Sequence, residues 1–128
     1  MNWKIMAVDD HQAMRTLLRI AFECHGFEVT EVPDGRSAVE MVNTLHPHLI
    51  LMDVRMPRMD GFTACQLIRS TAETADIPII HLSSETCQAH QDESKRSGAN
   101  LYLEKALSPF ELVDRVQEML RNHYYQST

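Results

Sequence analysis

The chain has 128 residues, which suits one domain, and its 44% apolar and 23% charged residues argue against intrinsic disorder. Lys and Arg number 12 against 18 Asp and Glu, so the net charge is −6. An acidic chain disfavours direct binding to nucleic acid and leaves room for a cation site. We therefore expect a single domain over residues 1–128 with no nucleic-acid partner.

The sequence also disfavours a membrane or secreted setting. No run approaches the roughly 20 apolar residues of a membrane span, and the acidic residues at 9 and 10 come too early for a signal peptide. Cys24, Cys65 and Cys87 are odd in number and lack CxxC spacing. We interpret them as reduced thiols of a cytoplasmic protein, not as a disulfide framework or a zinc site.

Short apolar runs alternate along the chain with stretches of helical periodicity. The runs have the length and the Ile, Val and Leu content of strands, and they lie at 5–8, 27–32, 49–52, 77–82 and 101–103. Helical spacing of apolar residues follows at 14–22, 38–45, 64–68 and 112–120. The predicted helix at 85–97 has almost no apolar stripe, so we expect it to be weakly held.

The start of the last helix carries the strongest local signal. Ser108 is the predicted N-cap, Pro109 the first helical residue, and Glu111 completes a capping box. Asp60-Gly61 similarly predicts a turn and a helix start.

Five strand–helix units with short loops predict a parallel sheet with helices on both faces. The first and third runs are continuously apolar, as in strands buried on both sides, while the second alternates, as at an edge. We predict an α/β, flavodoxin-like, doubly wound sheet of five strands in the order 2-1-3-4-5.

Polar residues follow the predicted strands where a ligand crevice should lie, at the carboxyl ends around the switch point. Asp9 and Asp10 end the first strand and Asp53 ends the third. At about 4 Å and an effective dielectric near 20, each like-charge pair costs on the order of 4 kcal/mol. Either raised pKa values or a hard divalent cation such as Mg²⁺ must neutralise these carboxylates.

The other strand ends supply a hydroxyl and an ammonium group. Ser83 ends the fourth strand, and Lys105 follows the fifth. Acids, a hydroxyl and one fixed cation suit a phosphoryl group carried on a carboxylate, held by metal on one side and by Lys and Ser on the other.

These residues resemble those of the response-regulator receiver domains of bacterial two-component systems, including single-domain chemotaxis regulators. The matching segments are VDD at 8–10, MR at 14–15, DVRMP at 53–57, MDG at 59–61, SS at 83–84, GA at 98–99 and YLEK at 102–105. The joint pattern is specific where each piece alone is weak. It implies one receiver domain with a core over about 4–122 and a short tail over 123–128.

The resemblance implies a role for each residue of the site. Asp53 is the expected phosphoacceptor, and Asp10, Asp53 and the main-chain carbonyl of Arg55 are the expected ligands of Mg²⁺, with Mn²⁺ as the alternative. Asp9 is expected to act through a metal-bound water. Lys105 and Ser83 are expected to bind the phosphoryl oxygens, and Ser83 and Tyr102 to form the switch pair.

The resemblance also implies partners and a mechanism. The phosphoryl group is expected from the phosphohistidine of a sensor histidine kinase or a histidine phosphotransfer protein. Phosphorylation is then expected to switch the surface of the fourth helix, fifth strand and fifth helix, which a downstream protein or an effector domain reads. Such a domain assists its own phosphorylation and dephosphorylation and is not an enzyme with a separate substrate.

One position departs from the family, and two others form a pair that we expect to tune it. Ala106 follows Lys105 where the family usually has Pro, often after a cis bond, so a cis and a trans peptide both stay open here. Arg55 and Glu85 lie two residues beyond Asp53 and Ser83. We hypothesise that they pair across the mouth of the site and slow hydrolysis of the phosphoryl group.

Other interpretations compete with these. A pseudo-receiver would dock proteins without being phosphorylated, although the acids and the lysine that such modules usually lose are all present. An aspartyl-phosphate phosphatase needs an acid two residues after its nucleophile, where Arg55 stands. Several residues also have plain structural interpretations. They are Tyr102 as an edge-strand aromatic, His81 as a packed core residue, His46 and His48 as a solvated loop, and Arg15, Arg19 and Arg69 as solvated helix faces.

Overall fold

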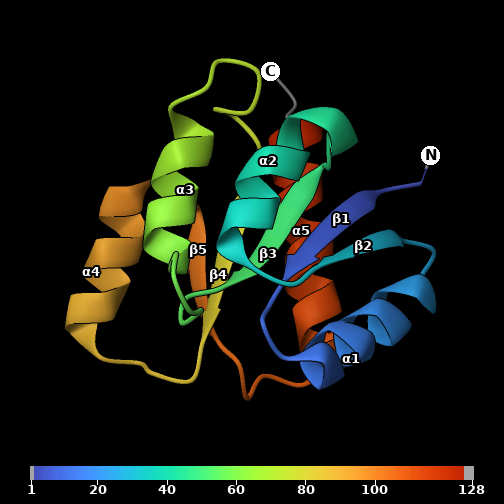
Figure 1. Ribbon diagram of the computed structural model, residues 1–128. Helices are drawn as coiled ribbons and strands as arrows, with labels where there is room; N and C mark the ends of the chain where they lie inside the picture. Colours follow the sequence, from blue (N-terminus) through green and yellow to red (C-terminus); the bar gives the residue numbers. More distant parts are fainter. Residues whose placement is uncertain (1, 126–128) are drawn as a thin grey trace.

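Strands and helices alternate along residues 2–125, the part of the chain that the computed structural model describes (Figure 1). The strands are β1 (Lys4–Val8), β2 (Glu28–Val32), β3 (Leu49–Asp53), β4 (Ile79–Ser83) and β5 (Leu101–Glu104). The helices are α1 (Gln12–Glu23), α2 (Gly35–Leu45), α3 (Gly61–Arg69), α4 (Gln88–Ser97) and α5 (Pro109–Tyr124).

The strands form one parallel sheet in the order β2-β1-β3-β4-β5, which confirms the predicted doubly wound topology. Strand β1 lies between β2 and β3, so the connections reverse direction there and open a crevice at the carboxyl ends of β1 and β3. Strand β2 is an edge, as its alternating sequence predicted.

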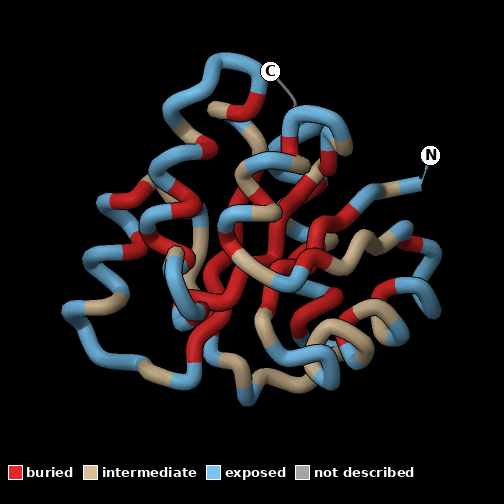
Figure 2. Tube along the Cα trace, in the orientation of Figure 1, coloured by how far each residue is buried: buried red, intermediate tan, exposed pale blue. Residues whose placement is uncertain are grey.

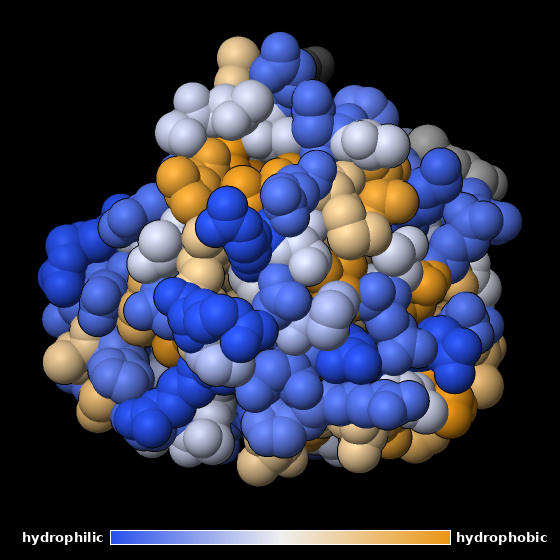
Figure 3. Space-filling model, viewed as in Figure 1, coloured by the Kyte–Doolittle hydropathy of each residue, from blue (hydrophilic) through white to orange (hydrophobic). Residues whose placement is uncertain are grey.

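Helices cover both faces of the sheet because neighbouring strand residues point to opposite sides. Ile5 and Ala7 pack with α1 and α5, whereas Met6 and Val8 pack with α2 and α3. Figure 2 shows the sheet as the buried centre, with exposed segments concentrated at loops and outer helix faces. Figure 3 shows hydrophilic residues over much of the viewed face, with apolar residues in scattered patches.

Short polar side chains fix the helix starts. Ser108 accepts a hydrogen bond from the Glu111 main-chain N–H at 3.2 Å, which confirms the predicted N-cap. Asp60 accepts one from the Thr63 N–H at 2.8 Å, which confirms the helix start predicted at Asp60-Gly61. Helix α4 begins at Gln88, three residues later than predicted. Its buried residues are two serines, Ser94 and Ser97, so it lacks the apolar stripe that anchors the other helices.

The prediction that Arg69 is solvated was wrong. Its guanidinium donates to the carbonyl oxygens of Ile77 at 2.7 Å and Gly98 at 2.8 Å, and to the Asn100 side chain at 2.8 Å. Arg69 therefore links α3 to the segment before β4 and to the segment between α4 and β5. An added Cβ at Gly98 would lie 2.8 Å from the Arg69 side chain, and φ there is +103°, so glycine is required.

Two histidine predictions had opposite outcomes. His81 is fully buried and hydrogen-bonded, as predicted. His48 is more than a solvated loop residue, because its Nδ1 accepts from the Lys4 N–H at 2.9 Å and its ring meets Trp3 edge-on. The Tyr124 hydroxyl donates to the His48 carbonyl at 2.7 Å and joins the end of α5 to this group.

Helix α5 continues to Tyr124, two residues past the expected end of the core. The rest of the expected tail, 126–128, lies outside the described residues. Among the residues described, no helix has both the length and the apolar character to cross a bilayer.

Candidate functional site

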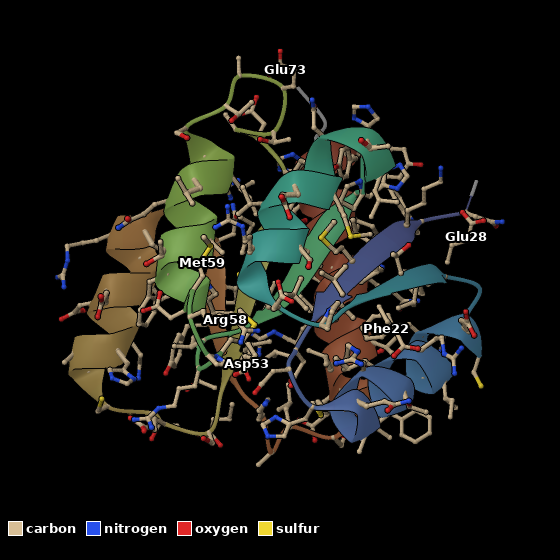
Figure 4. The ribbon with its side chains drawn as sticks, viewed as in Figure 1. Phe22, Glu28, Asp53, Arg58, Met59 and Glu73 are labelled. Carbon is tan, nitrogen blue, oxygen red and sulfur yellow. The ribbon has the colours of Figure 1, made fainter. Side chains whose placement is uncertain are left out.

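The carboxyl ends of four strands bring the predicted site residues to one edge of the sheet. Asp9 and Asp10 directly follow β1, Asp53 is the last residue of β3, and Ser83 is the last residue of β4. Lys105 follows β5, and its main-chain N–H donates to the Ser83 carbonyl at 2.8 Å. Asp53 lies beside the β3–α3 loop that carries Arg58 and Met59 (Figure 4).

Lys105 bridges two buried carboxylates. Its Nζ lies 2.9 Å from Asp9 Oδ2 and 3.1 Å from Asp53 Oδ2. Asp9 is 1% exposed and Asp53 4% exposed, so water screens these charges poorly. One ammonium group therefore offsets part of the repulsion between two acids.

Burial dominates the electrostatics of Asp53. Loss of hydration raises the pKa of Asp53, the charge of Asp9 raises it further, and Lys105 offsets only part of this rise. For Lys105, burial lowers the pKa, but the hydrogen bond to Asp9 and the charges of Asp53 and Asp9 outweigh it, so the net pKa is raised. The site thus holds more negative charge than Lys105 alone neutralises.

The donor set fits a hard divalent cation. Asp9, Asp10, His11 and Asp53 each place one ligand atom within 4.8 Å of the others. Asp10 Oδ1 is buried without a hydrogen bond, and His11 Nδ1 lies 3.2 Å from it. Carboxylate and carbonyl oxygens are the ligands that Mg²⁺ prefers, and the charge of such an ion would offset the negative charge that Lys105 leaves unneutralised.

Main-chain contacts hold these carboxylates in place. The His11 N–H donates to Asp9 Oδ1 at 2.8 Å, and the Arg55 N–H lies 3.3 Å from Asp53 Oδ1. Gly61 lets the start of α3 approach β3, since an added Cβ would lie 2.4 Å from the Asp53 carbonyl oxygen. The loop after Asp53 is therefore packed against the strand that carries it.

Arg15 is a supporting residue that the sequence interpretation missed. It is not a solvated face residue, because its Nη1 donates to the Asp9 carbonyl at 2.7 Å and its Nε lies 3.4 Å from Glu31. Arg15 thereby stabilises the turn between β1 and α1. The sequence signal for this role was the position of Arg15, one turn into the helix that follows Asp9 and Asp10.

The hydroxyl and the aromatic residue meet at the β4–α4 loop. Ser83 Oγ is buried and accepts from the Glu85 N–H at 3.0 Å. The Tyr102 hydroxyl donates to the carbonyl of the same Glu85. One residue of this loop therefore contacts both Ser83 and Tyr102.

Arg55 and Glu85 form an ion pair between the β3–α3 and β4–α4 loops. The Arg55 side chain is 68% exposed and that of Glu85 36%, so the pair lies at the solvent side of the site. The peptide bond between Lys105 and Ala106 is trans, because the described residues contain no cis peptide bond.

Comparison with known proteins relates this geometry to one family. A family model described as the response regulator receiver domain matches residues 5–117. The chain is 37% identical over 128 residues to the probable transcriptional regulator ycf27 of Galdieria sulphuraria, covering 98% of this chain and 49% of that protein. It is 36% identical to the response regulator MprA of Mycobacterium leprae, in a match that covers 92% of this chain and 51% of that protein. The chain spans about half the length of these curated relatives.

Solved structures agree in fold over nearly their whole length. The Vibrio cholerae chemotaxis protein CheY4 superposes with a TM-score of 0.88 at 30% identity, covering 92% of this chain and 98% of that one. The receiver domain of the sensor histidine kinase PA1611 from Pseudomonas aeruginosa PAO1 superposes with a TM-score of 0.84 at 30% identity. The match covers 96% of this chain and 98% of that one. That receiver domain has a magnesium ion coordinated in its active site cleft.

Proposed function

The chain belongs to the response regulator receiver domain family, and from that premise we propose that its Asp53 carboxylate accepts a phosphoryl group. Receiver domains are regulatory signal-transduction domains of two-component systems. The observation that carries the assignment is the Lys105 amine, which bridges Asp53 and Asp9 at one buried sheet edge. The pseudo-receiver alternative is not favoured, because no acid, hydroxyl or amine of the site is missing.

We propose that Asp10, Asp53 and the Arg55 carbonyl bind Mg²⁺ directly and that Asp9 acts through a water; Mn²⁺ has the same ligand preferences. When bound, the ion supplies positive charge that offsets the charge on the phosphoryl oxygens. An Asp53 oxygen forms the new bond to phosphorus as the bond from phosphorus to the donor's imidazole nitrogen breaks. Lys105 holds a phosphoryl oxygen during this transfer.

The switch follows from the contacts around Glu85. A phosphoryl group on Asp53 adds strong acceptor oxygens near Ser83, whose hydroxyl turns to donate to them. Ser83 Oγ then releases the Glu85 N–H, and the Glu85 carbonyl no longer holds the Tyr102 hydroxyl in its present place. Tyr102 moves inward, and the surface of α4, β5 and α5 changes.

The Arg55–Glu85 pair sets the lifetime of the phosphoryl group in this proposal. The pair joins the two loops on either side of the acceptor. Water must pass between these loops to attack the acyl phosphate. A closed pair therefore slows hydrolysis, and an open pair permits it.

The partners follow from the chemistry. The donor is a phosphohistidine of a sensor histidine kinase or of a histidine phosphotransfer protein, because its phosphoryl group is transferred readily to a carboxylate. The altered surface is read by a downstream protein or by an effector domain. We place this exchange in the cytoplasm, where reduced thiols such as Cys24 and Cys87 persist.

Labelling with a small phosphodonor tests the acceptor. Wild-type protein incubated with acetyl phosphate and Mg²⁺ should take up one base-labile phosphoryl group, measured by intact mass and by migration on a phosphate-affinity gel. Asp53→Asn should take up none, because an amide is a poor nucleophile. Asp114→Asn, on the exposed side of α5, is the matched control and should label like wild type. Labelling of Asp53→Asn to wild-type extent would reject the assignment.

A further inference from the structure

A second group of metal-binding side chains lies outside the acidic site, where the β4–α4 loop enters α4. Glu85, Cys87 and His90 each place one ligand atom, a carboxylate oxygen, a thiol sulfur and a ring nitrogen, within 4.8 Å of the other two. Cys87 is the N-cap of α4 and His90 lies three residues later, so the first turn brings both onto one face.

The ligand atoms of Glu85 and His90 face each other, and Cys87 has a free thiol. Arg55 pairs with Glu85 Oε1, which leaves Oε2 facing His90 Nδ1 at 3.4 Å. His90 Nδ1 is buried and makes no hydrogen bond to the described part of the chain. Cys87 is a free thiol, and its side chain does not cap the helix.

The ring of His90 packs against α3. It meets Phe62 of α3 edge-on, with ring centroids 6.0 Å apart and an interplanar angle of 81°. His90 and Phe62 also line a cavity of about 510 Å³ together with Arg55 and Glu93. A neighbouring helix therefore packs against the imidazole, and there is open space on the side of His90 that faces this cavity.

The ligand chemistry differs from that of the acidic site. A thiolate, an imidazole and a carboxylate favour Zn²⁺ and related transition ions, whereas magnesium prefers an all-oxygen set. Donors around a tetrahedral zinc ion lie roughly 3.3–3.8 Å apart, given bonds of about 2.0–2.3 Å. The three ligand atoms now lie within 4.8 Å of one another, so a bound ion would draw them closer together.

We propose that Glu85, Cys87 and His90 form a three-ligand site for Zn²⁺, with water in the fourth position. The cysteine spacing did not predict this site because one cysteine alone supplies the sulfur ligand. The other two ligands come into reach only because α4 begins at Gln88, one residue beyond Cys87.

The site has a regulatory consequence, which rests on the proposed function. Glu85 carries the main-chain contacts to Ser83 and Tyr102. Zinc bound to its side chain fixes the loop in the conformation that these contacts require. Zinc should therefore lower the extent of phosphorylation by acetyl phosphate in wild-type protein and leave Cys87→Ser unaffected.

Cobalt substitution tests the site without any phosphorylation. Wild-type protein titrated with Co²⁺ in excess Mg²⁺ should bind one ion with a thiolate-to-cobalt charge-transfer band and the intense visible bands of tetrahedral cobalt, and Zn²⁺ should remove both. Cys87→Ser should abolish the charge-transfer band. His90→Gln and Glu85→Gln should weaken binding by about tenfold or more.

Cys24→Ser is the matched control, because Cys24 is also an exposed free thiol but lies at the end of α1. It should give the wild-type spectrum. The proposal is overturned by a wild-type protein without the charge-transfer band, by a band that Cys87→Ser keeps or Cys24→Ser loses, or by wild-type affinity in His90→Gln. Loss of phosphorylation with an intact cobalt spectrum would count against the proposed function alone.

Discussion

At the residue scale, the chemistry of the site follows from how one amine is shared between two acids. Lys105 lies closer to Asp9, at 2.9 Å, than to Asp53, at 3.1 Å. Burial and the neighbouring Asp9 charge raise the pKa of Asp53 in spite of this contact. A bound cation would favour the ionised, nucleophilic form of Asp53, so metal binding and readiness for phosphoryl transfer are coupled.

The Arg55–Glu85 pair gives a residue-scale prediction. Arg55→Ala and Glu85→Ala should each shorten the lifetime of the acyl phosphate several-fold, because either change opens the path between the two loops. Hydrolysis of the acyl phosphate in the double variant should be no faster than in either single variant, since each substitution removes the same contact. Decay of the phosphorylated species, followed by phosphate-affinity gel after donor removal, measures this.

Arg36→Ala is the matched control, since Arg36 is exposed on α2 away from the pair. The acyl phosphate of this variant should decay at the wild-type rate. Unchanged lifetimes in both Arg55→Ala and Glu85→Ala would remove the pair from the account of hydrolysis.

The sequence predicted some residues of the site and not others for a physical reason. Asp9, Asp53 and Lys105 end or follow parallel strands, and the topology alone brings such positions to one edge. Arg15 and Arg69 act on main-chain carbonyls, which every residue has. Residue identity therefore carries no signal for such contacts, and only the folded backbone defines them.

At the element scale, α4 differs from the other helices in what holds it. Its buried residues are Ser94 and Ser97, whereas α5 buries Leu112, Val113, Val116 and Leu120. Ser94 Oγ contacts His81 Nδ1 at 2.6 Å, so one polar contact replaces an apolar face. The sequence predicted the lack of an apolar stripe in α4, but it placed the start of α4 too early because it missed Cys87 as the N-cap.

Hydrogen exchange tests this difference between helices. Main-chain amides of α4 should exchange at least about tenfold faster than those of α5 in the unphosphorylated protein, because local opening of α4 exposes little apolar surface. Exchange measured by mass spectrometry on peptides from 88–97 and 109–124 gives the comparison, with α5 as the internal reference. Equal protection of the two helices would contradict the account.

At the scale of the whole molecule, the two helix layers enclose a sheet whose interior includes a titratable histidine. His81 lies in β4 with no exposed surface, and its ring nitrogens contact Ser94 Oγ and the Gly61 carbonyl. Loss of hydration lowers the pKa of His81 to about 4, and the Gly61 hydrogen bond offsets only part of this. The folded protein therefore keeps His81 neutral at pH values where an unfolded chain protonates it.

The contribution of His81 to stability should consequently fall as the pH drops. Between the ordinary histidine pKa of 6.5 and about 4, the unfolded state binds a proton that the folded state does not. The free energy of unfolding should decrease across this window, by roughly 3 kcal/mol in total from His81. Urea unfolding at a series of pH values, followed by the fluorescence of Trp3, measures the slope.

His81→Gln should flatten the slope between pH 6.5 and 5, whatever its effect on absolute stability, because glutamine does not titrate. His123→Gln, at the exposed end of α5, is the control and should keep the wild-type slope. A His81→Gln slope equal to that of wild type would show that His81 does not govern the acid sensitivity.

Chemical mapping of the phosphorylated residue tests the central claim most directly. Borohydride reduces an aspartyl phosphate to homoserine, and tandem mass spectrometry of the digested protein locates that residue. After treatment with acetyl phosphate and Mg²⁺, homoserine should appear at position 53 in wild-type protein and at no position without the donor. Homoserine at position 9 or 10, or none anywhere despite a labelled protein, would contradict the assignment of Asp53 as the acceptor.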